Sequence, residues 1–352
     1  MAKAFLFDCQ IAGVSGNMIV GALINLGANA EAVKKAMEKA SNNLSPTTVE
    51  IKSVLRGKIA ATLVEVKTGH EKCSYSELKK AILKSGLSEK EINLAIKILE
   101  NLIKAEAHVH GTTVNQVNLH EIGSPDTVAD IIGAIVAANA VGLFENKILS
   151  TPIATGHGTI RIEDGEFTIP PPVTLELLKG IPFIKGKIET ELATPTGVAI
   201  LRNFVQNYVI DLPIFKPEKI GYGAGSQDFK NIPNVLRIMS GELLESKFLT
   251  DSVCVLETNI DNVSGEIIGY VLQKLMEAGA KDAVAIPCIM KKGRPGQIIK
   301  VISDIKKADF LAELLAKETG TLGIRKFPEV QRLILSREIV TIEVKVGDII
   351  EK

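Results

Sequence analysis

The last hundred residues of the chain place strand and helix patterns in an order that few folds accommodate. Four runs rich in apolar and β-branched residues are separated by two amphipathic runs, the first of which begins at Ser264 and stops at Gly279. The order β-α-β-β-α-β is that of the split βαβ, or ferredoxin-like, arrangement. The strand patterns lie at 252–260, 282–290, 296–304 and 324–344, and the helix patterns at 264–280 and 306–320.

The sequence stops soon after its last long strand pattern. Gly347 and Asp348 read as a turn, and Ile349 and Ile350 begin another apolar pair before the final two residues. A domain that closed there would leave one sheet edge without a partner. We therefore expect the ferredoxin-like domain to lack a C-terminal tail or to be completed by a segment from elsewhere.

The first 245 residues mix strand and helix patterns without an internal repeat. A buried strand at 4–9 leads through a glycine-bearing turn into a helix at 18–27, and Gly57 and Lys58 join two β-rich runs as a hairpin. Ser88, followed by Glu91, is a capping box that opens a helix over 88–109. The fold class predicted is α+β, with a metal-handling mixed α/β domain at 1–245 and the ferredoxin-like, nucleotide-binding domain at 246–352.

Charge and composition exclude several classes of partner. Lysine plus arginine and aspartate plus glutamate number 41 each, and the chain has no tryptophan, so neither nucleic acid nor a membrane surface is an expected partner. The start of the chain lacks the pattern of a signal peptide, no apolar run reaches the roughly 18 residues of a bilayer span, and the four cysteines are far apart. We expect a cytoplasmic protein that finds its partners through local sites.

A histidine and three carboxylates crowd into the segment 120–130, in a chain with five histidines. Ser124 is an expected N-cap with Pro125 at the first helical position, so the helix dipole alone accounts for Asp126. Asp130 lies one turn further on the same face, where a partly desolvated carboxylate needs a cation or donors. Carboxylates and imidazoles suit a divalent first-row metal, but structural ion pairs gather the same residues. The candidate ligands are His120, Glu121, Asp126 and Asp130, with His110 upstream.

The turn after the first strand is a second ambiguous site. Asp8 ends the strand, and Gly13, Ser15 and Gly16 open the following helix, a geometry whose free backbone N–H groups can hold an anion. The spacing matches neither the P-loop nor the dinucleotide-binding glycine motif. A plain glycine turn with a buried aspartate therefore remains the other interpretation, and Asp8 is a further candidate metal ligand.

A cationic loop in the C-terminal domain is the third candidate site. Lys291, Lys292, Gly293 and Arg294 lie between two strand patterns, so they predict a hairpin loop whose charges suit phosphate. Solvated turn lysines are the alternative. On the first strand, Glu257, Asn259 and Asp261 alternate with Thr258 and Ile260, which places carboxylate and amide oxygens on one face of the strand and its end. Both halves together suit a triphosphate with its bound Mg²⁺ or Mn²⁺.

The chain as a whole resembles the nickel-insertion proteins of the nickel-pincer cofactor, the LarC family. The matching stretches follow in the family's order over essentially the whole sequence. They are FDCQIAGVSGNM, AEAHVHG, LHEIGSPD, PPPVTLELLKGIP, ELATPTGVAILR, GYGAGSQDFKNIPNVLR, LETNID, MKKGRPG and ETGTLGIR.

The resemblance implies a CTP-dependent nickel chelatase, a lyase that inserts Ni²⁺ into pyridinium-3,5-bisthiocarboxylic acid mononucleotide. Two Ni–S bonds and one Ni–C bond form, and CMP and diphosphate are released. The implied partners are CTP with Mg²⁺ or Mn²⁺, the cofactor precursor, and the enzyme that receives the finished cofactor; we also expect a homo-oligomer. The family's acidic and histidine positions match Asp8, His110, His120, Glu121, Asp126 and Asp130, and its basic positions match Lys291, Lys292, Arg294 and Arg325.

The sequence departs from the family's pattern at three asparagines. Asn17 and Asn262 stand where an aspartate is usual, and Asn118 precedes Leu119 where relatives often carry histidine. Each change removes a charge or an imidazole from a candidate metal site. Two other functions therefore stay open: a non-catalytic nickel or nucleotide carrier, which would bind metal without turning over CTP, and a metal-dependent phosphohydrolase. The second is disfavoured because the cations and the carboxylates lie in different domains.

Overall fold

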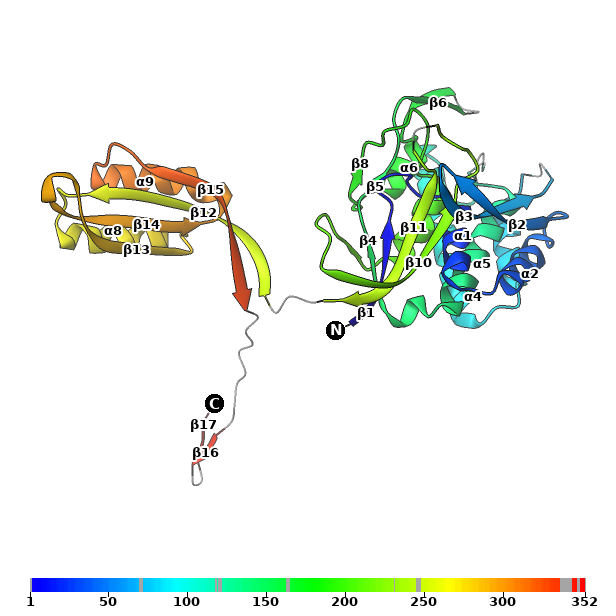
Figure 1. Cartoon of the computed structure of the whole chain (residues 1–352), viewed down its shortest axis with the longest axis horizontal. Helices are drawn as coiled ribbons and strands as arrows, with labels where there is room; N and C mark the ends of the chain where they lie inside the picture. Colours follow the sequence, from blue (N-terminus) through cyan, green and yellow to red (C-terminus); the bar gives the residue numbers. More distant parts are fainter. Residues whose placement is uncertain are drawn as a thin grey trace. The chain divides into compact units, whose positions relative to one another are not determined.

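The computed structural model divides the chain into two compact units, residues 1–245 (unit 1) and 246–352 (unit 2). It describes residues 2–69, 72–117, 119, 122–162, 165–230, 232–244, 248–335, 344–346 and 349–351. Both units combine helices and strands, so the predicted mixed α and β content is confirmed (Figure 1). Within the described residues, none of the helices has the length and apolar character that a bilayer crossing requires.

Unit 1 is built on a mixed seven-stranded sheet. Its first strand, β1 (Ala2–Asp8), is central, with β11 antiparallel on one side and β4 parallel on the other. The predicted hairpin of β2 and β3 pairs with β10 through β3. The sheet order is β2 (Thr48–Arg56), β3 (Ile59–Lys67), β10 (Phe215–Ala224), β11 (Val235–Leu243), β1, β4 (Lys147–Ser150), β9 (Asn207–Tyr208).

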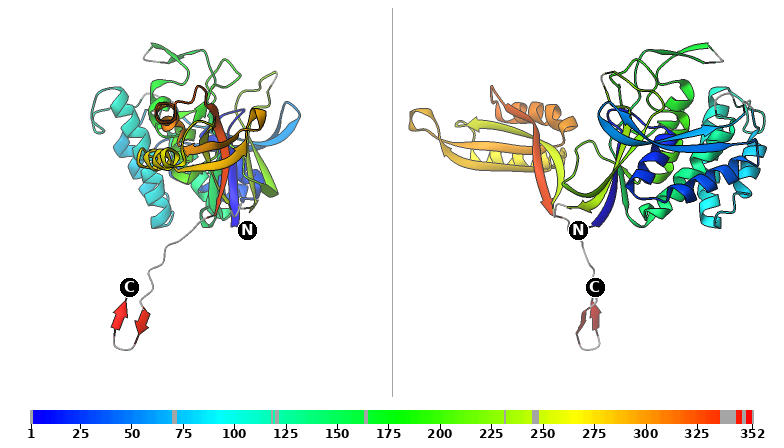
Figure 2. Two further views of the ribbon diagram at one scale, coloured as in Figure 1. Left: turned by 90° about the vertical axis from the view of Figure 1, so that its left-hand side faces the viewer. Right: turned by 45° about the vertical axis from the view of Figure 1, so that its right-hand side comes forward.

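The longer helices of unit 1 gather on one side of this sheet (Figures 1 and 2). α1 approaches β10 so closely that a Cβ on Gly223 would lie 1.9 Å from the Met18 carbonyl oxygen. The bounds are α1 (Gly16–Leu26), α2 (Ala30–Ser41), α3 (Tyr75–Leu83), α4 (Glu89–Val109), α5 (Pro125–Ala140), α6 (Pro172–Leu177) and α7 (Pro195–Phe204). Short elements complete the unit: η1 (Leu143–Glu145), β5 (Ile153–Ala154), β6 (Thr159–Ile162), β7 (Gly165–Thr168) and β8 (Phe183–Ile184).

Local signals in the sequence fix several helix ends. The Ser88 side chain accepts from the Glu91 N–H and the Glu91 carboxylate accepts from the Ser88 N–H, which is the predicted capping box at the start of α4. Ser124 is the N-cap of α5 and Pro125 its first residue, as predicted. Gly27 ends α1 with a φ of 132°, a conformation that side-chain-bearing residues rarely adopt.

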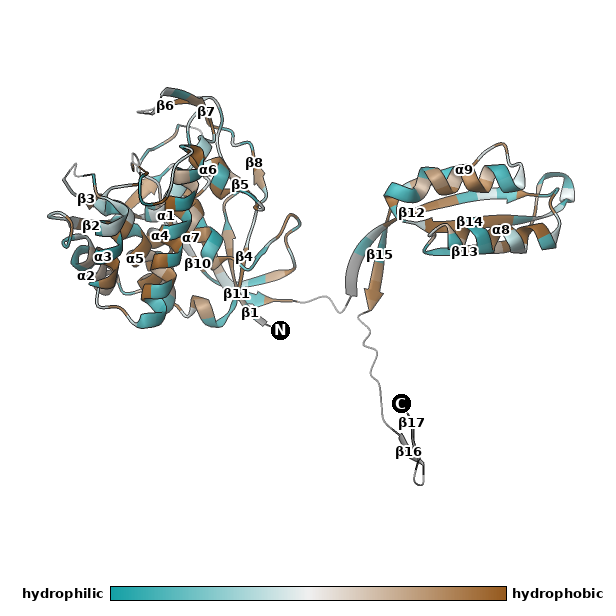
Figure 3. Ribbon diagram, turned by 180° about the vertical axis from the view of Figure 1, so that it is seen from behind, coloured by the Kyte–Doolittle hydropathy of each residue, from teal (hydrophilic) through white to brown (hydrophobic). Residues whose placement is uncertain are grey.

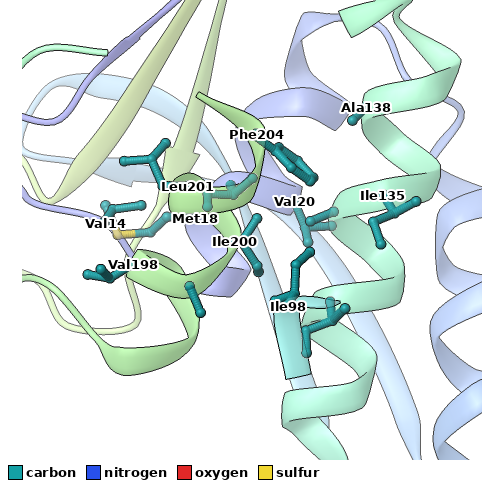
Figure 4. Packing of buried hydrophobic residues seen from close by; sticks show 14 of the residues in the cluster. Val14, Met18, Val20, Ile98, Ile135, Ala138, Val198, Ile200, Leu201 and Phe204 are labelled. Atoms are coloured by element: carbon teal, nitrogen blue, oxygen red, sulfur yellow. The ribbon is translucent and has the colours of Figure 1, made fainter. Parts of the chain in front are cut away.

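One apolar core joins the helices of unit 1 to the sheet. Figure 4 shows side chains of α1, α4, α5 and α7 meeting in it. The labelled residues are Val14, Met18 and Val20, Ile98, Ile135 and Ala138, and Val198, Ile200, Leu201 and Phe204. Because α1, α5 and α7 share this core, the places where these helices begin are held in fixed relation to one another.

Unit 2 follows the predicted order of strands and helices. Its four-stranded antiparallel sheet has the order β13 (Asp282–Ile289), β14 (Pro295–Ser303), β12 (Phe248–Ile260), β15 (Arg325–Leu335). α8 (Gly265–Glu277) and α9 (Ala308–Thr319) carry both polar and apolar residues along their length (Figure 3). The core they form with the sheet includes Leu256, Val271, Leu275, Ile299, Val301, Leu311 and Leu315.

The last described residues form a separate strand pair. β16 (Val344–Val346) pairs antiparallel with β17 (Ile349–Glu351), and the predicted turn between them, Gly347 and Asp348, lies outside the described residues. The apolar pair at 349–350 therefore finds a partner strand in the residues just before it. The expected missing tail stays a prediction from the sequence.

Candidate functional site

A cleft in unit 1, with a volume of about 540 Å³, brings together the beginnings of three helices. Its lining includes residues from the first turns of α1, α5 and α7, the end of β3 and two residues before α7. We call it the unit 1 cleft. Its polar lining residues are Ser15, Asn17, Glu65, Lys67, Asp126, Thr127, Asp130, Glu191, Thr194, Thr196 and Ser226.

Two glycines allow the three helix starts to meet. A Cβ on Gly16, the first residue of α1, would lie 2.3 Å from the Asp130 Oδ2 atom of α5. A Cβ on Gly197, in the first turn of α7, would lie 2.5 Å from the Val14 carbonyl oxygen, just before α1. Side chains at either position would force the helices apart. Since the first N–H groups of a helix have no acceptor within it, the cleft is rich in backbone donors.

Asp130 is the least satisfied polar group in this cleft. Its Oδ1 atom is buried and has no hydrogen-bond partner within the described part of the chain. Burial raises the pKa of the Asp130 carboxyl well above its ordinary value, and the charge of Asp126 raises it further. A hydrogen bond from the Asn17 backbone N–H acts in the opposite direction. A buried carboxylate in this state needs a proton or a cation, and the cleft gives a cation access to it.

Asp126 lies one turn before Asp130 and is more exposed. It accepts hydrogen bonds from the Ser124 hydroxyl and, at 2.9 Å, from the Thr127 N–H. The helix start thus satisfies part of this carboxylate, as the simpler interpretation of Asp126 predicted. Both aspartates line the same cleft, and the charge of Asp126 acts on the Asp130 carboxyl, so two carboxylates that suit a divalent cation lie near each other.

Asn17, one of the departures from the family's pattern, also lines the cleft. Its Oδ1 atom accepts from the Ser15 hydroxyl at 2.5 Å, and its Nδ2 donates to the Val64 carbonyl at 3.4 Å. The Nδ2 donor connects α1 to β3, and the Oδ1 acceptor binds the N-cap residue of α1; an ionised carboxylate has no donor for the first of these bonds. Asn17 therefore has a structural role at the start of α1.

The other predicted metal ligands of unit 1 lie elsewhere or outside the described residues. Asp8 pairs with Arg237 of β11, and the Asp8 side chain is 12% exposed. His110 lies at the end of α4, with its Nε2 atom 3.8 Å from the Glu106 carboxylate. His120, Glu121 and Asn118 are outside the described residues, immediately before the lining residue Ile122. Within the described ranges, no group of three or more histidine, cysteine, aspartate or glutamate side chains could hold a metal ion.

Several lining residues were not singled out from the sequence. Glu65 and Lys67 end β3, and Thr194 and Thr196 begin α7. The signal for the α7 residues was present in the stretch ATPTG, where a threonine N-cap precedes a proline at the first helical position. Nothing local indicates that this helix start meets α1, because 178 residues (194 minus 16) separate them.

Unit 2 has its own cavity, with a volume of about 590 Å³, at the end of β12 and the start of α8. Asp261 lines it, together with residues on both sides of the predicted cationic loop. The Arg294 Nη1 atom lies 3.4 Å from the Asp261 carboxylate, so the loop and the end of the acidic strand do meet. The residues that line this unit 2 cavity include Ile260, Val263, Gly265, Cys288, Ile289 and Gly296.

The cationic loop itself is exposed. Lys291, Lys292 and Gly293 form a short helical turn, η2, between β13 and β14, and the Met290 N–H donates to the Arg294 carbonyl across it. Lys292 has a φ of 61°, a left-handed conformation that is uncommon outside glycine. The predicted hairpin loop is thus present.

The remaining predicted residues of unit 2 form an ion-pair cluster on the sheet. The Arg325 guanidinium donates to the Glu257 carboxylate at 2.9 and 3.1 Å and also contacts the Asn259 side chain. Lys300 lies 3.3 Å from the same carboxylate. Glu257 does not line the unit 2 cavity, whereas Asp261, beyond the end of β12, does.

Nickel insertion proteins match this chain over nearly its whole length. The family model described as "Nickel insertion protein" matches residues 5–352. A putative nickel insertion protein of Methanothermobacter thermautotrophicus is 40% identical over 97% of this chain and 83% of its own length. The pyridinium-3,5-bisthiocarboxylic acid mononucleotide nickel insertion protein of Geobacillus kaustophilus is 36% identical over 99% of this chain and 88% of its own.

A solved structure also matches part of the chain. It is the apo form of LarC2, the C-terminal domain of a cyclometallase involved in the synthesis of the NPN cofactor of lactate racemase. The match has 33% identity and a TM-score of 0.26, and it covers 29% of this chain and 78% of that one.

Proposed function

We propose a function from the premise that this chain belongs to the nickel insertion protein family. The chain inserts Ni²⁺ into pyridinium-3,5-bisthiocarboxylic acid mononucleotide, the substrate for which two relatives at 36% identity are named. The observation that carries this proposal is the Oδ1 atom of Asp130, beside Asp126 in the unit 1 cleft, which is buried and has no hydrogen-bond partner among the residues that the structure describes. Such an oxygen needs a proton or a cation, and a cation bound in the cleft would satisfy it.

Nickel is the cargo of this reaction, and the unit 1 cleft is its proposed holding site. Asp126 and Asp130 offer hard oxygen ligands, which bind Ni²⁺ less strongly than the sulfur atoms of two thiocarboxylates would. Transfer from oxygen to sulfur is therefore favourable. A Ni–C bond forms only when the ring carbon loses its proton, and a carboxylate in the cleft accepts that proton.

We place CTP in unit 2, whose strand order supports a ferredoxin-like domain. Arg294 and the neighbouring lysines supply charge for the phosphates, and Asp261 beside the unit 2 cavity suits Mg²⁺ or Mn²⁺. Glu257 suits that ion less well because Arg325 and Lys300 already neutralise it. Nucleotide transfer from CTP would activate the ligand. The receiving enzyme, a homo-oligomeric state and a cytoplasmic location remain predictions from the sequence.

The direct test combines the purified chain with the cofactor precursor, CTP, Mg²⁺ and Ni²⁺. We expect a nickel-containing product by mass spectrometry and release of CMP. Absence of both contradicts the enzyme proposal, and nickel binding without either product identifies a non-catalytic carrier. Product formation without CTP would contradict only the nucleotide requirement.

Replacing Arg294 with glutamine should weaken CTP binding by about tenfold or more, because a charge-assisted contact to phosphate is lost. Isothermal titration of CTP into the full chain measures this. Arg332→Gln is the matched control, since Arg332 lies in the same unit and pairs with Asp251 away from the unit 2 cavity. Equal weakening by both variants would show a general charge effect and not a binding site.

A further inference from the structure

The proposed reaction needs a group that accepts a proton, and the unit 1 cleft offers several carboxylates. The described residues that line it include Glu65, Asp126, Asp130 and Glu191. Asp126 and Asp130 are assigned to nickel, and an oxygen that shares its electrons with a metal ion is a weaker base. Among these four residues, Glu65 and Glu191 are therefore the ones that can accept the proton leaving the ring carbon as the Ni–C bond forms.

Glu65, near the end of β3, is engaged by the neighbouring strand. The Lys52 Nζ atom of β2 lies 3.0 Å from the Glu65 carboxylate, whose side chain is 40% exposed. To accept a proton, Glu65 would have to give up this ion pair. A general base must also stay within hydrogen-bond reach of the proton that it removes, and an exposed side chain on a hairpin is poorly held for that task.

Glu191 is oriented by a neutral hydroxyl group. The Thr174 hydroxyl of α6 donates to the Glu191 Oε1 atom at 3.3 Å, and Thr174 is fully buried. A hydroxyl can donate to a carboxylate and, after turning about its C–O bond, accept from a protonated carboxyl. This contact can therefore persist when Glu191 takes up a proton, which an ion pair with a lysine does not allow.

The backbone around Glu191 is bound to the segment that leads into α1. Glu191 forms an antiparallel bridge with Gly156. The Val14 N–H donates to the Leu192 carbonyl at 3.0 Å, two residues before α1 begins. The first turn of α1 in turn donates a backbone hydrogen bond to Asp130. A short chain of backbone contacts thus fixes Glu191 relative to the proposed nickel-holding side of the cleft.

We infer that Glu191 accepts the proton that leaves the ring carbon, and that Thr174 positions the Glu191 carboxylate for this step. The electron pair of the C–H bond becomes the Ni–C bond, and the proton moves to a Glu191 oxygen. Nickel stays divalent, so the step needs neither an oxidant nor a reductant. The inference rests on the proposed function and names the carboxylate that the proposed reaction requires.

Glu191→Gln keeps the size of the side chain but removes the proton acceptor. In single-turnover insertion by the full chain with precursor, CTP, Mg²⁺ and Ni²⁺, we expect a slowing of about a hundredfold or more, the usual range for loss of a general base. Isothermal titration should show unchanged Ni²⁺ binding, because Asp126 and Asp130 remain in place. Glu189→Gln is the matched control, since Glu189 is exposed, belongs to the same segment and does not line the cleft.

Glu191→Ala separates lost chemistry from a distorted cleft. The substitution leaves space where the carboxylate was, so added formate, a small carboxylate, should restore part of the insertion rate as its concentration rises. A variant that is slow because its cleft is distorted would not respond to formate.

Thr174→Val tests the positioning role, because valine has nearly the same shape but no hydroxyl. We expect insertion to slow by about tenfold, the size expected for loss of a hydrogen bond to a charged group. At saturating Ni²⁺, the acid limb of the pH–rate profile should move to higher pH, since the carboxylate loses a donor that favours its charged form. A packing defect alone would lower the rate without moving this limb.

Insertion by Glu191→Gln at the wild-type rate would overturn the inference. Loss of Ni²⁺ binding in that variant would also overturn it, because Glu191 would then act on the metal, as would loss of insertion in Glu65→Gln while Glu191→Gln stays active. In each of these cases the wild type still inserts nickel, so the proposed function stands. A wild type that forms no nickel-containing product overturns the proposed function itself.

Discussion

Asp130→Asn should abolish nickel insertion and at the same time make the metal-free protein more stable at neutral pH. The substitution keeps the shape of the side chain but removes the charge of a carboxylate whose buried Oδ1 atom has no partner among the described residues. We expect insertion to slow by at least about a hundredfold, comparable with the loss of a positioned proton-transferring group. Leaving a buried polar group unsatisfied costs about 1–3 kcal/mol, and removing its charge recovers part of that free energy of unfolding.

The pH dependence of stability gives this prediction a second readout. Burial raises the folded-state pKa of Asp130, so between the ordinary carboxyl pKa and the raised value the folded state holds a proton that the unfolded state has lost. The free energy of unfolding of the wild type therefore falls as pH rises through this window. The asparagine variant should lack this contribution. Denaturant titrations of metal-free protein across the acid to neutral range measure the difference.

Asp211→Asn serves as the control, because Asp211 is an exposed aspartate of the same unit and does not line the cleft. It should change neither insertion nor the pH profile. Asp130→Asn with full insertion activity would remove the basis for placing nickel in this cleft. If Asp130→Asn had a lower free energy of unfolding than the wild type at neutral pH, the claim that the Asp130 charge destabilises the metal-free protein would be wrong.

Gly16→Ala should both destabilise unit 1 and inactivate the protein. The new methyl group would lie 2.3 Å from Asp130 Oδ2 and 2.7 Å from Asp130 Cβ, so α1 and α5 must separate or the carboxylate must leave its position. Overpacking of this kind typically costs about 1–3 kcal/mol. Chemical denaturation measures the loss, and the insertion assay reports the displaced carboxylate.

A double variant shows whether the clash with Asp130 is the cause. Asp130→Ala removes the carboxylate that the Gly16→Ala methyl group would strike, so the two substitutions together should cost less stability than the sum of their separate effects. Activity should stay absent in the double variant. Strict additivity of the two effects would place the clash elsewhere. Gly269→Ala is a control for helical glycine replacement, because nothing lies within 4 Å of its added Cβ.

Features that depend on neighbouring residues could be predicted from the sequence. The Ser88 capping box, the Gly57 turn between β2 and β3, and the start of α5 at Pro125 each follow from a few adjacent side chains. The order of elements in unit 2 followed from hydrophobic periodicity, because each of its strands and helices buries one face against the others. Because these signals lie in residues that are close together in the chain, a single sequence is enough to predict them.

The pairing of charged groups could not be predicted in this way. Asp8 is neutralised by Arg237, 229 residues away, and Glu257 by Arg325, 68 residues away. An isolated carboxylate and a paired one look alike in the sequence. The meeting of α1, α5 and α7 depends on Gly16 and Gly197, whose importance appears only when the opposing helix is in place. Asp130 was named as a candidate, but the burial of its Oδ1 atom, without a partner in the described part of the chain, is a property of the fold.

Anomalous diffraction at the nickel edge, from crystals of the full chain soaked with Ni²⁺, tests the central claim most directly. The account predicts a nickel peak in direct contact with a carboxylate oxygen of Asp130, and no such peak in Asp130→Asn crystals. A peak bound only at other side chains, with Asp130 unliganded in the occupied protein, would contradict the assignment of nickel to the cleft where α1, α5 and α7 begin.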